Sequence, residues 1–128
     1  MRLLLDTHTL LWALQDTSRL SRNAAQALAE PAAEMLVSPV SAYEIHLKYT
    51  LGKLPGAKFL AEKFDEVIAT IDCRPLPITL LHASRAGTLD LAHRDPFDRL
   101  LMAQSLIEGV PLVSNETIFD QFGVERIW

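Results

Sequence analysis

The sequence is poor in several features that would point to a compartment. It has one cysteine, Cys73, so no internal disulfide can form, and we expect Cys73 to be a buried small hydrophobic residue. No apolar run approaches the length of a membrane span, and the run at positions 3–5 is too short for a signal-peptide core. These absences predict a cytoplasmic protein that does not contact a membrane.

Several sequence motifs that bind metals or phosphates, or that carry a serine nucleophile, are also missing. The four histidines have no zinc-binding spacing, and neither a G-x-S-x-G motif nor a Gly-rich phosphate loop is present. The net charge of −4 argues against a simple nucleic-acid-binding module, since such modules are usually basic. A nuclease is not excluded, because bound cations reverse the local field of a carboxylate cluster.

The length and composition predict one ordinary domain that spans residues 1–128, with 49% hydrophobic and 22% charged residues. Short apolar runs predict strands at 3–5, 35–37, 74–78, 110–114 and 124–127. Helical spacing and caps predict helices at 9–14, 21–29, 41–51, 59–71, 79–86, 96–108 and 116–122. This alternation predicts an α/β fold, a three-layer α/β/α sandwich with a central, mainly parallel sheet.

Four acidic positions lie at strand ends or at the helix starts nearby. Asp6 follows the first strand, and Glu44 lies in the first turn of the helix after the second. Asp98, with Asp95, lies at the start of the helix before the fourth strand, and Glu116 follows that strand. Ligands of open α/β sheets collect beyond the carboxyl ends of the strands. Carboxylate oxygens are the ligands that Mg²⁺ and Mn²⁺ accept, so together the four acids predict a metal site that could activate a water for phosphodiester hydrolysis.

Each acid also has a purely structural interpretation. Asp6 could cap the following helix, and Glu44 could complete a capping box with Ser41. Asp98 and Glu116 could simply favour the positive end of a helix dipole. For each helix-start acid taken alone, the structural interpretation is the more common one.

Basic and imidazole side chains stand beside these acids and could contact a phosphate backbone. Arg94 and Arg99 flank the Asp95–Asp98 segment, and Lys48 lies one turn after Glu44. His8 and His93 also adjoin acidic positions. An ordinary solvated or hydrogen-bonded surface residue is the alternative in each case, and Arg99 could equally pair with a neighbouring acid.

Four segments of the chain resemble the motifs of VapC-type toxins, the PIN-domain endoribonucleases of bacterial toxin–antitoxin pairs. The segments are Leu3-Leu4-Leu5-Asp6-Thr7-His8, Val40-Ser41-Ala42-Tyr43-Glu44-Ile45 with Leu51-Gly52-Lys53-Leu54, the stretch from His93 to Gln104, and Leu112-Val113-Ser114-Asn115-Glu116. The third is the most specific, and the resemblance covers nearly the whole chain. It implies a PIN-domain-like fold.

The resemblance also implies roles for the acids. Asp6 and Asp98 would hold the principal Mg²⁺ or Mn²⁺, Glu44 would complete the site or position the water, and Glu116 would support it or a second ion. Position 116 is often Asp in this family, and the longer Glu side chain could reach the metal through water. Further candidates to support the ligands or contact substrate are Asp95 (or simply a helix cap), Thr7, Ser114, Arg99 and His93.

The resemblance implies an RNA substrate, silencing by a cognate antitoxin protein, and a homodimer. Two other interpretations stay open. One is a catalytically inactive PIN-like binding module. The other is an aspartyl-phosphate phosphotransfer enzyme, or a related receiver domain, since Asp6-Thr7-His8-Thr9 outlines an Asp-x-Asp-x-Thr loop with His8 in place of the second acid.

Overall fold

The computed structural model describes residues 1–90 and 95–128 of the chain. Its core is a five-stranded sheet in which every strand pair is parallel. The strands are β1 (Arg2–Leu5), β2 (Glu34–Val37), β3 (Arg74–Pro75), β4 (Leu112–Val113) and β5 (Arg126–Ile127). All five predicted strands are therefore present, although β3, β4 and β5 are shorter than predicted.

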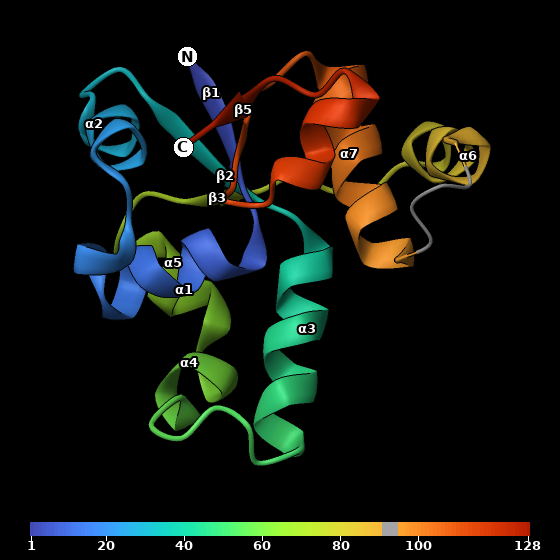
Figure 1. Cartoon of the computed structure of the whole chain (residues 1–128). Coiled ribbons are helices and arrows are strands. Elements are labelled where there is room, and N and C mark those ends of the chain that lie inside the picture. Colours follow the sequence, from blue (N-terminus) through green and yellow to red (C-terminus); the bar gives the residue numbers. More distant parts are fainter. Residues whose placement is uncertain (91–94) are drawn as a thin grey trace.

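The strand order is β3-β2-β1-β4-β5, with β1 at the centre (Figure 1). The chain builds the sheet outward from β1 through β2 to β3, then crosses to the other side of β1 to add β4 and β5. In open parallel sheets such a reversal leaves a crevice at the carboxyl ends of the two strands that flank it. Here those strands are β1 and β4, so the topology places the crevice at the residues that follow Leu5 and Val113.

Side chains of β1 alternate between two hydrophobic cores, one on each face of the sheet. Leu3 and Leu5 belong to one core, together with Leu10 of the first helix, whereas Leu4 and Leu112 belong to the other. Because successive residues of a strand point to opposite faces, an apolar run such as Leu3-Leu4-Leu5 requires cover on both sides. The predicted α/β fold with a covered parallel sheet is confirmed.

Helices form the two outer layers. They are α1 (Thr7–Gln15), α2 (Arg22–Ala29), α3 (Pro39–Thr50), α4 (Lys58–Glu62), α5 (Phe64–Ala69), α6 (Leu80–Thr88) and α7 (Pro96–Glu108), with short 3-10 turns η1 (Thr17–Arg19) and η2 (Thr117–Phe122). Figure 1 shows α1, α2 and α5 on one side of the strands and α7 on the other. Helix α7 begins after Asp95 and ends at Gly109, whose left-handed φ of 63° suits glycine, as the sequence predicts.

Three predicted helix boundaries are wrong. Helix α3 begins at Pro39 with Ser38 as its N-cap, not at Ser41. The predicted helix 59–71 is divided at Lys63, whose φ of −128° is not helical, into α4 and α5. Gly87 does not end α6, which continues through Thr88.

No helix in the described part of the chain is long and apolar enough to cross a bilayer.

Candidate active site

Three polar residues lie directly beyond the three central strands, and all three are buried. Asp6 follows β1 and is 5% exposed, whereas Ser38 after β2 and Ser114 after β4 are exposed by 1% and 0%. Burial of a polar side chain costs free energy unless its hydrogen bonds are satisfied. We therefore expect the buried polar side chains at the carboxyl edge of the sheet to form specific hydrogen bonds.

Asp6 is held by contacts to both α1 and β4. Its Oδ1 accepts a hydrogen bond of 2.8 Å from the backbone N–H of Thr9, which makes it the N-cap of α1. Its own N–H donates to the carbonyl of Val113 at 3.2 Å, and the Thr9 hydroxyl donates to the same carbonyl at 2.8 Å. Helix capping by Asp6 is thus confirmed, and it places the acid against the end of β4.

A chain of three side chains joins α1 to α3. The Thr7 hydroxyl donates to Glu44 Oε1 at 2.7 Å and lies 3.0 Å from the Ser41 hydroxyl. A hydroxyl has one hydrogen, so when Thr7 donates it to Glu44 Oε1, the Ser41 hydroxyl must donate to Thr7. Thr7 and Ser41 are 4% and 0% exposed, which removes competition from bulk water.

The predicted capping box of Ser41 and Glu44 is therefore wrong. Ser41 lies inside α3, where its backbone N–H donates to the carbonyl of Ser38, so it has no N-cap role. The Glu44 carboxylate turns instead to Thr7, which is 37 residues away in sequence. Glu44 is thus attached to the segment that carries Asp6.

Asp98 lies in the first turn of α7, close to the helix that carries Glu44. The neighbouring rings of Phe97 and Tyr43 lie 5.1 Å apart, so the first turn of α7 meets α3 beside Glu44. Asp95 is the N-cap of α7, with Oδ1 accepting from the N–H groups of Phe97 at 2.9 Å and Asp98 at 3.3 Å. The structure thus gives Asp95 the role of helix cap that the sequence offered as one of two possibilities.

The segment after β4 carries Ser114 and Glu116. The backbone N–H of Glu116 donates to the Ser114 hydroxyl at 3.0 Å, and the Glu116 side chain is exposed. Arg126 of β5 donates to the carbonyl of Ser114 at 3.0 Å and forms a paired contact with the Asp120 carboxylate at 2.8 and 3.0 Å. Hydrogen bonding from Arg126 lowers the pKa of Asp120, so the Asp120 carboxylate stays charged and keeps its contact with Arg126.

Arg99 is directed at the end of α6. It is 8% exposed, and its guanidinium donates to the carbonyls of Ala86, Leu89 and Asp90 at 3.0, 2.7 and 2.8 Å. Ala86 lies in the last turn of α6, and Leu89 and Asp90 follow its end, so Arg99 supplies donors to carbonyl groups at the helix terminus. The geometry gives Arg99 a structural task in joining α6 to α7. His93 lies outside the described residues.

A preassembled metal site is not present in residues 1–90 and 95–128, where no three histidine, cysteine, aspartate or glutamate side chains are grouped closely enough to hold an ion. The structure joins Thr7 to Glu44 and sets Asp6 beside the end of β4, but it does not gather the four acids into one cluster. The donor chemistry nevertheless suits a hard cation, because the acids offer only carboxylate oxygens.

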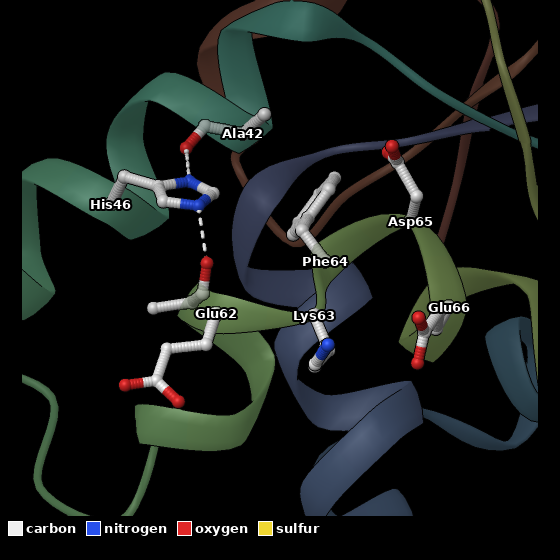
Figure 2. A pocket seen from close by; sticks show the side chains of 8 residues that line it. Ala42, His46, Glu62, Lys63, Phe64, Asp65 and Glu66 are labelled. Carbon is white, nitrogen blue, oxygen red and sulfur yellow. Dashed lines mark hydrogen bonds between the residues drawn. The ribbon is translucent and has the colours of Figure 1, made fainter.

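A separate pocket lies on the opposite side of α3, between α3 and the α4–α5 turn (Figure 2). His46 bridges the two elements there, with Nδ1 2.6 Å from the carbonyl oxygen of Ala42 and Nε2 2.8 Å from that of Ala61. Of the side chains that the structure describes, those lining this pocket include none of the four candidate acids. The hydrogen bonds of His46 hold the end of α4 against α3, just before the helix is interrupted at Lys63.

Sequence reasoning missed Ser41 as a partner of the site, because its position suggested a helix cap. It also missed Trp12 and Lys53, which line a pocket with His8 and Lys48. The four-residue spacing between His8 and Trp12, which puts both rings on one face of a helix, was an available signal.

Several solved structures have a similar fold. The chain is similar to one in the structure of VapBC2 from Rickettsia felis bound to a DNA fragment from their promoter, with a TM-score of 0.72, 16% identity, and 98% and 97% of the two chains covered. It is also similar to a chain of VapBC-1 from nontypeable Haemophilus influenzae, with a TM-score of 0.68, 14% identity and 98% and 96% coverage. A toxin–antitoxin complex from Klebsiella pneumoniae gives a TM-score of 0.60, 18% identity and 89% and 86% coverage. At these identities the likeness concerns the fold.

No curated protein sequence matches the chain. The family model described as PIN domain matches residues 3–125, which span β1 from Leu3 onward, β2, β3, β4 and all of the candidate acids. Neither the phosphotransfer enzyme nor the receiver domain is supported by this match. The chain belongs to the PIN domain family.

Proposed function

We propose that this PIN domain is a Mg²⁺- or Mn²⁺-dependent endoribonuclease that acts as the toxin of a toxin–antitoxin pair. The observation that carries the proposal is the hydrogen bond from Thr7 to Glu44 beside the buried Asp6. It ties two acids to the carboxyl edge of the sheet at the β1–β4 crevice, where α/β folds place their ligands. A fold alone does not establish an activity, so the proposal rests on these side chains within a family of this kind.

Asp6 and Asp98 are the residues we assign to the principal ion, with Glu44 completing the site or positioning the attacking water and Glu116 supporting it. A bound divalent cation would supply an activated water and stabilise the leaving oxygen of a phosphodiester. The chain's own contribution is orientation. Thr7 fixes one oxygen of Glu44, and the α1 cap fixes one oxygen of Asp6.

The scattered arrangement of the acids is consistent with this assignment. Carboxylates at close range repel one another and stay apart until a cation removes the conflict. The exposed Glu116 side chain has the freedom to turn toward an ion. We therefore expect the site to be completed by metal binding rather than formed beforehand.

The partners we propose are an RNA substrate, an antitoxin protein and a second copy of the chain, in the cytoplasm. One solved structure with this fold is described as a toxin–antitoxin complex. Helix α3 and its C-cap expose Tyr43, Leu47 and Leu51 at intervals of four residues, with 55%, 42% and 57% of each residue accessible. Such an apolar stripe is suited to covering by a protein partner.

The test is cleavage of a structured RNA with Mg²⁺, with Mn²⁺ and in excess chelator. The protein is purified through a denaturing step and refolded, so that bound antitoxin is removed. We expect cleavage that requires metal and that disappears in an Asp6→Asn/Asp98→Asn variant, since Asn still caps α1 but offers no anionic ligand. The matched control is Asp65→Asn/Asp72→Asn, which changes the charge equally at exposed positions.

The binding-module alternative has one observation in its favour, namely that no group of three metal-binding side chains is preassembled in the described residues. Absence of cleavage by folded wild-type protein with either metal would favour this alternative. Equal activity of the folded Asp6→Asn/Asp98→Asn variant and the control variant would refute the assignment of the acids.

A further inference from the structure

A second pocket lies between α1, α3 and the segments that follow these two helices, and it has a volume of about 460 Å³. It is lined by His8, Trp12 and Gln15 of α1, Asp16 and Arg19 after it, Lys48 of α3, and Lys53 in the following loop, together with Leu11 and Leu54. This volume lies within the range of about 300–1,000 Å³ that is usual for small-ligand sites.

The pocket lies on the same two helices as the candidate active site. His8 directly follows Thr7, and Lys48 stands four residues after Glu44 on α3, which is about 6 Å along the helix. A chain of nucleotides that passes the acids at the sheet edge would therefore continue into this pocket.

The aromatic side chains in the pocket form a short stack. The rings of His8 and Trp12 lie 5.7 Å apart with their planes inclined by 28°, and the indole of Trp12 is packed in turn against Trp128, also at 5.7 Å. His8 is exposed and Trp12 is half-buried, so the stack is anchored at one end and accessible at the other. Nucleic-acid bases stack on such rings whatever their sequence.

The charge of the pocket is opposite to that of the whole chain. Three cationic residues, Arg19, Lys48 and Lys53, face one anionic residue, Asp16, in a protein with a net charge of −4. Asp16 lies 3.4 Å from Arg19, and a hydrogen bond from Ser18 lowers the pKa of Asp16, so this pair neutralises itself. Lys48 and Lys53 supply the remaining positive charge.

We propose that this pocket binds one nucleotide of single-stranded RNA next to the scissile phosphate, with the base stacked on His8 and Trp12 and the phosphate held by Lys48 and Lys53. This inference rests on the proposed nuclease function. It explains how an acidic protein holds a polyanion, because the positive charge is concentrated where the strand leaves the acids.

The test measures binding of a short fluorescein-labelled single-stranded RNA of mixed sequence, in excess chelator, as a function of salt. Chelation separates binding from cleavage. We expect Lys48→Gln/Lys53→Gln to weaken binding by roughly tenfold or more and to reduce the salt slope by about 0.7 for each phosphate that is no longer neutralised. The matched control is Lys58→Gln/Lys63→Gln, at two exposed lysines that do not line this pocket.

Two further variants test the stacking. Trp12→Leu and His8→Ala should each weaken binding roughly fivefold or more without changing the salt slope, since stacking releases no counterions. His8 is exposed, so the His8→Ala variant keeps the test valid if replacement of Trp12 disturbs the packing against Trp128. Thermal unfolding of each variant establishes that it is folded.

Three outcomes would overturn the proposal: no RNA binding by the wild type in chelator, equal binding by the Lys48/Lys53 and control variants, or binding that is insensitive to both ring substitutions. An oligoglutamate peptide tests another occupant. If its binding depends on Lys48 and Lys53 as strongly as RNA binding does, and if neither ligand is affected by the ring substitutions, the pocket is assigned to an acidic protein segment instead. Failure of the proposed nuclease function can be told apart from failure of the pocket proposal. If RNA binding depends on these residues but no metal-dependent cleavage occurs, only the proposed function is refuted.

Discussion

The hydroxyl of Thr7 lies 2.7 Å from Glu44 Oε1 and links the first turn of α1 to α3 across 37 residues of sequence. The adjacent residue, Asp6, caps α1 and follows the central strand. Glu44 is therefore held by Thr7, the residue next to Asp6, although the two acids lie far apart in the sequence. A rigid support of this kind is what a metal ligand needs, because partners of the ligands set their orientation.

Replacing Thr7 with Val tests this support. The change removes the hydroxyl and keeps the shape, so we expect Mn²⁺ affinity to fall roughly 10–100-fold while the free energy of unfolding drops by only about 1 kcal/mol. Calorimetric titration with Mn²⁺ and urea unfolding measure the two quantities. Thr88→Val, at an exposed hydroxyl on α6, is the control. Unchanged Mn²⁺ affinity in folded Thr7→Val protein would show that Thr7 does not position a ligand.

Arg99 should matter for stability rather than for RNA binding. Its guanidinium satisfies three backbone carbonyls at the end of α6 from a site that is only 8% exposed. We expect Arg99→Met to lower the free energy of unfolding by about 3 kcal/mol, since charged hydrogen bonds contribute more than neutral ones. Urea unfolding measures this, with the exposed Arg85→Met as the control. A decrease no larger than that of the control would contradict the structural role.

The Asp120–Arg126 pair predicts a specific dependence of stability on pH. The guanidinium lowers the pKa of Asp120 below the ordinary 3.8, so the folded state favours the carboxylate. This stabilisation is present above pH 3.8 and disappears as the pH falls through the lowered pKa of the folded state. We expect Asp120→Asn to be less stable than wild type at neutral pH and the difference to shrink below pH 3.8. Thermal unfolding from acidic to neutral pH measures it, and a constant difference would refute the pairing.

Cys73 should be chemically inert in the folded protein. Burial raises the pKa of its thiol from 9.0 to about 12, so the thiolate fraction at about pH 8 falls by about a thousandfold. We expect a thiol-reactive disulfide reagent to modify Cys73 slowly in native protein and rapidly in urea. The prediction that Cys73 is a small buried residue is confirmed, since it is 4% exposed within the core that contains Leu5. Fast modification without denaturant would indicate that this core opens.

Much of the fold follows from local chemistry. The apolar runs of β1 and β2, the cap at Asp95 and the left-handed glycine after Glu108 each depend on a few consecutive residues. Such signals are readable because strand burial, capping and positive φ are properties of short segments. The sequence also indicated which acids lie at strand ends and helix starts, and hence the edge of the sheet where the candidate site is found.

The sequence alone determined the order of the elements and the parallel sheet, whereas the tertiary structure decided which side chains meet. Ser41 reads locally as a helix cap, yet packing of α1 against α3 makes it a partner of Thr7 and turns Glu44 away from a capping box. In the sequence Arg99 is a basic residue beside acids, but in the structure its guanidinium donates hydrogen bonds to backbone carbonyls at the end of α6. These contacts join residues 9 to 37 positions apart. No local propensity encodes them, because a hydrogen-bond partner is selected by the packing of elements and by the cost of burying a polar group unpaired.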